Sequence, residues 1–164
     1  MMKKLVLTGA AGRLGSYLRE PLSKMCQELV STDIVDDIGT LYEGESYAKA
    51  DVAVYDQIAP LLEGADMVVH FGAIVDEKPF EELLGPNFIG IDAPHKPDTF
   101  YGLAKCFSED LASMYWDKRG LEAVCLRILS CAQVNNTRAL GSWLSYDDLI
   151  QLVTRAVDTP SVGF

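Results

Sequence analysis

Three glycines at intervals of three residues follow a short apolar run near the start of the chain. The run spans residues 5–8 (LVLT), and the glycine motif spans residues 8–15 (TGAAGRLG). Apolar residues then recur at helical spacing through residues 12–25. The sequence therefore predicts a buried parallel strand, a tight glycine-rich turn and a helix in that order, although an ordinary turn would also accept three glycines.

The motif predicts a binding site for a diphosphate at the start of that helix. Gly9 would make the tight turn, Gly12 would let the backbone approach the diphosphate, and Gly15 would let the helix pack closely. The backbone amides at the start of the helix, those of Arg13 and Leu14 among them, would bind the anion together with the helix dipole. A strand, this motif and a helix are typical of a dinucleotide-binding fold.

An acidic residue lies at the end of the second predicted strand, which spans residues 28–34. Asp33 stands 18 residues after Gly15, where a carboxylate accepts hydrogen bonds from the adenosine ribose, although it could also cap a helix. Residues 34–37 (IVDD) contain no Arg or Lys that could receive a 2′-phosphate, and Asp36 and Asp37 would either repel one or simply face solvent. The pattern favours NAD over NADP.

Strands and helices alternate along the rest of the chain. Short apolar runs predict strands, and apolar residues at helical spacing predict helices, two of which should end at Gly64 and Gly120. The expected strands span residues 50–54, 66–71 and 122–128, and the expected helices span residues 57–63, 80–84, 100–118 and 147–157. This order predicts an α/β fold with a Rossmann-like, doubly wound parallel sheet, and a single NAD-binding domain over residues 1–164.

The longest predicted helix begins with a tyrosine and a lysine four residues apart. Tyr101 and Lys105 would lie on one face of that helix, close enough for the ammonium charge to favour a phenolate. The apolar residues of the helix, such as Phe107 and Leu111, form a different stripe. We interpret the pair as catalytic, with an ordinary surface pair as the alternative.

Charge and composition exclude several classes of protein. The 24 acidic and 14 basic residues among 164 give a net charge of -10, which disfavours a nucleic-acid partner. The four cysteines lack the spacing of metal ligands, and no metal site is predicted. No apolar run has the ~18 residues of a membrane span. We expect a cytoplasmic protein with reduced thiols.

Several segments resemble the extended short-chain dehydrogenase/reductase family. They are residues 8–15, Asp33, Asp51–Val52, residues 70–73 (HFGA) and residues 101–105 (YGLAK). Residues 77–84, 101–120 and 135–149 resemble, more narrowly, the uronate dehydrogenases. That resemblance implies an enzyme that uses NAD to oxidise a hexuronate, such as glucuronate or galacturonate, at C1 to the aldarolactone. A sugar-nucleotide epimerase or dehydratase, and an NAD-binding protein without turnover, are the alternatives.

The resemblance also implies roles for individual residues and a homo-oligomer. Tyr101 would be the catalytic base, and Lys105 would be its electrostatic partner and a ligand of the coenzyme ribose. Ser130 would hold the substrate, and Arg138 would bind its carboxylate, since an arginine fork binds a carboxylate in a bidentate way. Besides residues already named, the implied coenzyme contacts are Ile34, Asp51, Val52, Phe71, Gly72 and Ala73.

One stretch of the sequence is too short for this fold. A parallel strand, its crossover and the next strand need about 30 residues, yet only a short helix and a proline-containing loop separate the strand at residues 66–71 from Tyr101. We predict that Gly90 and Ile91 are not neighbours in the natural protein, and that an internal strand with the implied catalytic Ser or Thr is missing there. A C-terminal substrate lobe is expected beyond Phe164. A chain with a true junction would lack dehydrogenase activity.

Overall fold

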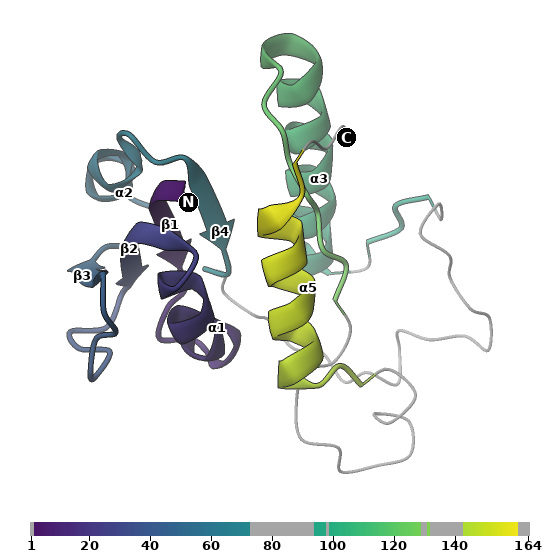
Figure 1. Cartoon of the computed structure of the whole chain (residues 1–164). Coiled ribbons are helices and arrows are strands. Elements are labelled where there is room, and N and C mark those ends of the chain that lie inside the picture. Colours follow the sequence, from purple (N-terminus) through teal and green to yellow (C-terminus); the bar gives the residue numbers. More distant parts are fainter. Residues whose placement is uncertain (1, 73–93, 98, 129–130, 132–142, 161–164) are drawn as a thin grey trace. The chain divides into compact units, whose positions relative to one another are not determined.

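The first apolar run forms a central strand of a parallel sheet in the computed structural model of the chain (Figure 1). β1 (Met2–Thr8) pairs with β2 (Cys26–Asp33) on one side and with β4 (Met67–His70) on the other. β3 (Glu45–Lys49) pairs with the far edge of β2, so the strand order is β3-β2-β1-β4. Parallel strands are covered on both faces, and the buried apolar residues of the two middle strands include Leu5, Val6, Leu7, Leu29 and Val30.

The structure describes residues 2–72, 94–97, 99–128, 131 and 143–160. The chain divides into two compact units. The first comprises Met1–Ala73 and Arg127–Thr159 and contains the sheet, and the second comprises Ile74–Leu126 and Pro160–Phe164. The predicted helix at residues 80–84 and the predicted break after residue 90 lie outside the described residues.

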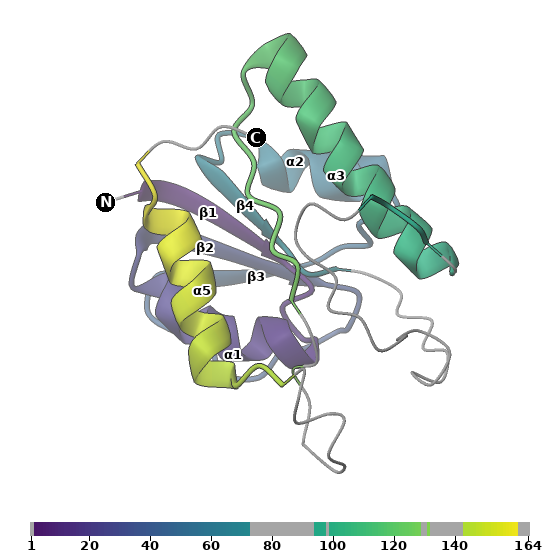
Figure 2. The ribbon, with the colours of Figure 1, turned by 90° about the vertical axis from the view of Figure 1, so that its right-hand side faces the viewer.

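Helices cover both faces of the sheet in the first unit (Figure 2). α1 (Arg13–Ser23) connects β1 to β2 and packs beside α5 (Tyr146–Asp158), and the rings of Tyr17 and Tyr146 stack with their centroids 3.9 Å apart. α2 (Tyr55–Leu62) connects β3 to β4 and lies on the opposite face, because right-handed crossovers in opposite directions require opposite faces. The apolar residues that α1 and α5 bury are Leu18, Leu22, Leu149, Val153 and Val157.

A buried ion pair holds α1 against the start of β3. Arg19 donates from Nε to Glu45 Oε1 at 2.7 Å and from Nη2 to Glu45 Oε2 at 3.0 Å, and the two side chains are 8% and 0% exposed. Glu45 also accepts hydrogen bonds from the Ser31 hydroxyl and the Tyr42 amide. Burial alone would raise the pKa of Glu45, but these hydrogen bonds and the charge of Arg19 outweigh burial and lower the pKa from its usual 4.5.

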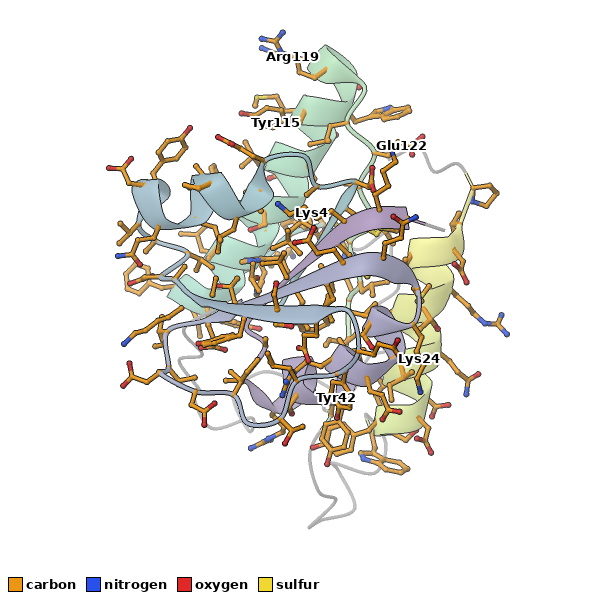
Figure 3. All side chains as sticks on the ribbon, turned by 60° about the vertical axis from the view of Figure 1, so that its left-hand side comes forward. Lys4, Lys24, Tyr42, Tyr115, Arg119 and Glu122 are labelled. Carbon is orange, nitrogen blue, oxygen red and sulfur yellow. The ribbon has the colours of Figure 1, made fainter. Side chains whose placement is uncertain are left out.

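The second unit contains the longest helix. α3 (Phe100–Arg119) follows Thr99, whose hydroxyl accepts a hydrogen bond from the Gly102 amide at 3.0 Å. It ends at Gly120, which adopts the left-handed conformation with φ 65°. Tyr115 projects from the last turns of this helix (Figure 3). The expected helix at residues 100–118 and its glycine stop are confirmed.

The predicted strand at residues 50–54 is wrong. The third strand is β3, which ends at Lys49, just before the predicted strand begins. β3 lies at the edge of the sheet, and its sequence (ESYAK) contains no run of buried apolar residues. Short apolar runs are typical of strands that are buried on both faces. An edge strand such as β3 lacks such a run, so the pattern does not predict it.

The predicted strand at residues 122–128 is also wrong. These residues have no regular secondary structure, and the side chains of Leu121 and Val124 are 57% and 45% exposed. In doubly wound sheets with strand order 3-2-1-4-5-6, a fifth strand separates the fourth from the sixth. Within the described ranges no strand lies beyond β4. Among the described residues, no strand is therefore available with which residues 122–128 could form a ladder.

The fold is a Rossmann-like α/β fold, as the order of elements predicts. The remaining predicted strands and helices of the first unit are found within a few residues of their expected places. The carboxyl ends of the four parallel strands meet at one edge of the sheet. Open α/β sheets bind ligands at this edge.

Candidate functional site

The loop after β1 has a backbone conformation that leaves no room for a Cβ at Gly9 or Gly15. Gly9 has φ +72°, and a Cβ there would lie 2.6 Å from the carbonyl carbon of Phe71. A Cβ on Gly15 would lie 2.1 Å from the carbonyl oxygen of Gly9, and one on Gly12 would lie 3.1 Å from the same oxygen. The loop therefore makes a tight turn at Gly9 and packs against α1 at Gly15. Ala11, Gly12 and Arg13 are exposed.

The first turn of α1 carries no side-chain cap. Gly12 stands at the N-cap position and no acidic residue lies in this turn, and among the described residues no side chain accepts a hydrogen bond from its amides. The first amides of a helix have no partner within the helix. Together with the helix dipole, they form a positive end that suits a diphosphate. Arg13 and Leu14 occupy this turn, so the loop fits a dinucleotide.

Asp33 connects the end of β2 to the glycine loop. Its Oδ2 accepts a hydrogen bond from the Ala11 amide at 2.8 Å, and its Oδ1 accepts one from the Ile34 amide at 2.7 Å. A carboxylate has about four lone-pair positions, so about half stay available for ribose hydroxyls. Residues 34–36 form bends rather than a helix, which excludes the helix-cap alternative for Asp33.

The residues that follow β3 and β4 reach the same edge of the sheet. Cγ1 of Val52 lies 3.3 Å from the place that a Cβ on Gly72 would occupy, so these two residues are neighbours. Asp51 accepts a hydrogen bond from the Ala53 amide at 2.9 Å, and the side chain of Ile34 is 63% exposed. The structure thus assembles the glycine loop and Asp33 with five further predicted contacts, which are Ile34, Asp51, Val52, Phe71 and Gly72.

Thr8 is a residue of this edge that the sequence interpretation missed. Its hydroxyl oxygen lies 2.6 Å from Nδ1 of His70 and accepts a hydrogen bond from the Gly72 amide at 3.3 Å. Thr8 therefore ties the end of β1 to the end of β4 beneath the glycine loop. The available signal was its position, directly before the first glycine of the motif.

The tyrosine and the lysine of α3 lie together in the second unit. Nζ of Lys105 lies 5.3 Å from the centroid of the Tyr101 ring, as a spacing of four residues in a helix predicts. The Thr99 cap fixes the turn that carries Tyr101, whose side chain is 36% exposed. The helix therefore places a positive charge beside an accessible phenol.

Three predicted site residues, Ala73, Ser130 and Arg138, lie outside the described residues.

In the part of the chain that the structure describes, no group of three or more His, Cys, Asp or Glu side chains could hold a metal ion. Within the same ranges, no helix combines the length and the hydropathy that a membrane span needs.

The sequence is similar to uronate dehydrogenases along nearly all of its length, although no family model matches it. The enzyme of Pseudomonas putida KT2440 is 38% identical over 196 aligned positions, which take in 98% of this chain and 73% of the relative. The chain belongs to the uronate dehydrogenase family. The uronate dehydrogenase of Agrobacterium fabrum C58 is 34% identical, with 99% of this chain and 74% of the relative covered.

Solved structures of the uronate dehydrogenase family share the fold. A variant of the Agrobacterium tumefaciens enzyme in complex with NAD has a TM-score of 0.87 and 32% identity, covering 99% of this chain and 75% of that chain. The glucuronic acid dehydrogenase of Chromohalobacter salexigens has a TM-score of 0.84 and 31% identity, covering 99% and 74%. A UDP-N-acetylglucosamine 4-epimerase from Bacillus cereus has a TM-score of 0.72 at 17% identity, which shows the fold alone.

The alignment with the uronate dehydrogenase family contains internal gaps. It runs over 196 positions, whereas the chain has 164 residues, so at least 32 aligned positions of the Pseudomonas putida enzyme have no counterpart here. The predicted loss of an internal segment between Gly90 and Ile91 stays a prediction.

Proposed function

We propose that this chain is an NAD-dependent uronate dehydrogenase that oxidises a hexuronate, such as glucuronate or galacturonate, at C1 to the aldarolactone. The observation that carries the proposal is the 34% to 38% identity to uronate dehydrogenases. The assembled edge of the sheet, with its glycine loop and Asp33, supports the coenzyme part of the proposal. The pair of Tyr101 and Lys105 supports the catalytic part.

The residues at the carboxyl edge of the sheet would hold the coenzyme. NAD, when bound, supplies the acceptor for the hydride that leaves C1 of the sugar. The glycine loop and the first turn of α1 would bind its diphosphate, and Asp33 would bind its adenosine ribose. The residues proposed to border the adenine and line the rest of the coenzyme are Ile34, Asp51, Val52, Phe71, Gly72 and Ala73.

Tyr101 would remove the proton from the C1 hydroxyl of the sugar. The positive charge of Lys105 near the ring would stabilise the negative charge on the phenol oxygen, and Lys105 would also bind the coenzyme ribose. A positioned general base typically accelerates a reaction by about 10²- to 10⁴-fold.

Formation of NADH tests the proposed function directly. The full chain is mixed with NAD and, separately, with glucuronate, galacturonate or a sugar nucleotide, and the absorbance of NADH is followed. We expect NADH to accumulate with a uronate and not with the sugar nucleotide. Conversion of the sugar nucleotide without release of NADH would instead identify an epimerase or dehydratase.

Arg138→Met is expected to raise the KM for uronates by about 10- to 100-fold, because a hydrogen-bonded charge pair with the substrate carboxylate would be lost. The rate with a neutral aldose should change little. Steady-state kinetics with both kinds of sugar measures the difference. Arg155→Met, on the exposed side of α5, removes the same charge and serves as the control. An equal effect on uronates and neutral aldoses would contradict the carboxylate role.

The chain lacks positions that its uronate dehydrogenase relatives have, and this favours a second candidate function, an NAD-binding protein without turnover. At least 32 aligned positions of the Pseudomonas putida relative are absent from this chain, and in the part of the chain that the structure describes no strand lies beyond β4 to pair with residues 122–128. Binding of NADH without NADH formation from any uronate would support this candidate.

We also propose that the chain forms a homo-oligomer in the cytoplasm and binds no nucleic acid. No residue of α3 is buried, and Phe100, Leu103 and Phe107 on this helix are 85%, 52% and 63% exposed, so its apolar side chains are available to a second copy. The net charge of -10 opposes binding to nucleic acid. Light scattering tests the homo-oligomer, and cell fractionation tests the cytoplasmic location. A DNA-binding titration tests the absence of nucleic-acid binding.

A further inference from the structure

The side chain of Lys49 places a positive charge beside Asp33, although residues 34–37 contain no basic residue. Lys49 ends β3, and the pairing register places it directly opposite Asp33, the last residue of β2. Neighbouring strands lie about 4.8 Å apart, and residues in register on parallel strands direct their side chains to the same face of the sheet. The stem of Lys49 therefore starts next to the stem of the proposed ribose ligand.

Lys49 is paired with an aspartate from the loop after β2. Its Nζ lies 2.5 Å from Oδ1 of Asp36, and the two side chains are 55% and 92% exposed. The hydrogen bond between them, and then their opposite charges, lower the pKa of Asp36 and raise the pKa of Lys49. Both groups are thus charged at neutral pH, and the charge of Lys49 is cancelled locally.

The loop that carries Asp36 is fastened to β3 at a second point. The hydroxyl of Tyr47 donates to the carbonyl oxygen of Val35 at 2.5 Å and lies 3.1 Å from that of Asp33. The neighbouring Asp37 has a different partner, because its Oδ1 accepts a hydrogen bond from the Gly39 amide at 3.0 Å. The contact with Lys49 therefore distinguishes Asp36 from Asp37.

NADP differs from NAD by a phosphate on the 2′-hydroxyl of the adenosine ribose. A phosphate monoester carries a charge of about −1.5 to −2 at pH 7, and dinucleotide-binding folds that accept NADP place a basic side chain near this position. Lys49 is a basic side chain at the carboxyl end of β3, next to the end of β2 that carries Asp33.

We propose that Asp36 is a specificity-determining residue for the coenzyme. By holding Lys49 in an ion pair beside Asp33, it withholds from the 2′-phosphate of NADP a cation that would otherwise bind that phosphate. The inference rests on the proposed function, because it takes Asp33 as the ligand of the adenosine ribose. Asp33 repels the phosphate through its own charge, whereas Asp36 acts by neutralising Lys49.

Asp36→Asn is expected to strengthen the binding of NADPH about tenfold and to change the binding of NADH less than about twofold. Asparagine keeps the shape of the side chain and removes the charge that holds Lys49. The dissociation constants of the full chain for NADPH and NADH are measured by titration, with the fluorescence of the reduced coenzyme as the signal. The gain should shrink at high ionic strength, because both partners are exposed.

Two further variants make the test specific to the ion pair. Asp37→Asn removes the same charge from the next residue without touching Lys49, and we expect it to change NADPH binding less than about twofold. The double variant Asp36→Asn/Lys49→Met should lose the gain. Equal gains in the two single variants, or a gain that survives in the double variant, would overturn the proposal.

The measurements with NADH separate this proposal from the proposed function. If the unmodified chain binds neither coenzyme, the coenzyme site itself fails, and the role of Asp36 fails with it. If NADH binds and Asp36→Asn leaves NADPH binding unchanged, only the role of Asp36 is wrong.

Discussion

Tyr101→Phe is expected to reduce turnover with uronates by about 10²- to 10⁴-fold, while the dissociation constant for NADH stays within about twofold of that of the unmodified chain. Phenylalanine keeps the ring that lies 5.3 Å from Nζ of Lys105 and removes only the hydroxyl that would accept the proton. The rate of NADH formation and a titration with NADH measure the two quantities.

Tyr115→Phe provides the matched control on the same helix. Tyr115 lies in the last turns of α3, far along the helix from Tyr101, and its side chain is 44% exposed (Figure 3). Loss of its hydroxyl should leave turnover unchanged. Substantial residual turnover in Tyr101→Phe would show that another group acts as the base.

Arg19→Met is expected to lower the free energy of unfolding by about 3 to 5 kcal/mol, because it leaves the carboxylate of Glu45 buried without its cation. Lys24→Met removes a cation from the same helix, but Lys24 and its partner Glu20 are 69% and 53% exposed. That control should cost only about 0 to 1 kcal/mol. Urea denaturation of the full chain measures both changes, and a similar cost for the two variants would contradict the importance of the buried pair.

The loss in free energy of unfolding that Arg19→Met causes should also depend on pH. The pKa of Glu45 is lower in the folded chain than its ordinary value of 4.5. The stabilisation from this group is therefore complete above that value and is lost as the pH falls through the lower, folded pKa. Arg19→Met removes much of this stabilisation. The difference between the two chains should be largest at neutral pH and should narrow below pH 4.5, which denaturation at several pH values measures.

The parts of the site that lie close together in the sequence could be predicted from it. The glycine motif, the strand before it and the helix after it are contiguous, and only glycine fits at Gly9 and Gly15. The pairing of Tyr101 with Lys105 follows from the period of one helix. Asp33 could be predicted because dinucleotide-binding folds place an acid at a regular distance from the glycines.

The parts that depend on strand pairing could not be predicted from the sequence. Lys49 stands 16 residues after Asp33, and only the register between β2 and β3 brings the two together. The composition of residues 122–128 is that of a strand, but a strand forms only beside another strand, and the sequence pattern of a segment does not show whether its neighbour exists.

The two amides held by Asp33 have a consequence for attempts to engineer coenzyme preference. Because Asp33 braces the glycine loop through Ala11 and the following turn through Ile34, replacing it removes a structural support as well as a ribose ligand. Variants at Asp33 are therefore expected to bind NAD less well, and they should gain little NADP binding from the loss of the repelling charge. Redesign that keeps this carboxylate and changes the charges around it would preserve the shape of the site while altering which dinucleotide it accepts.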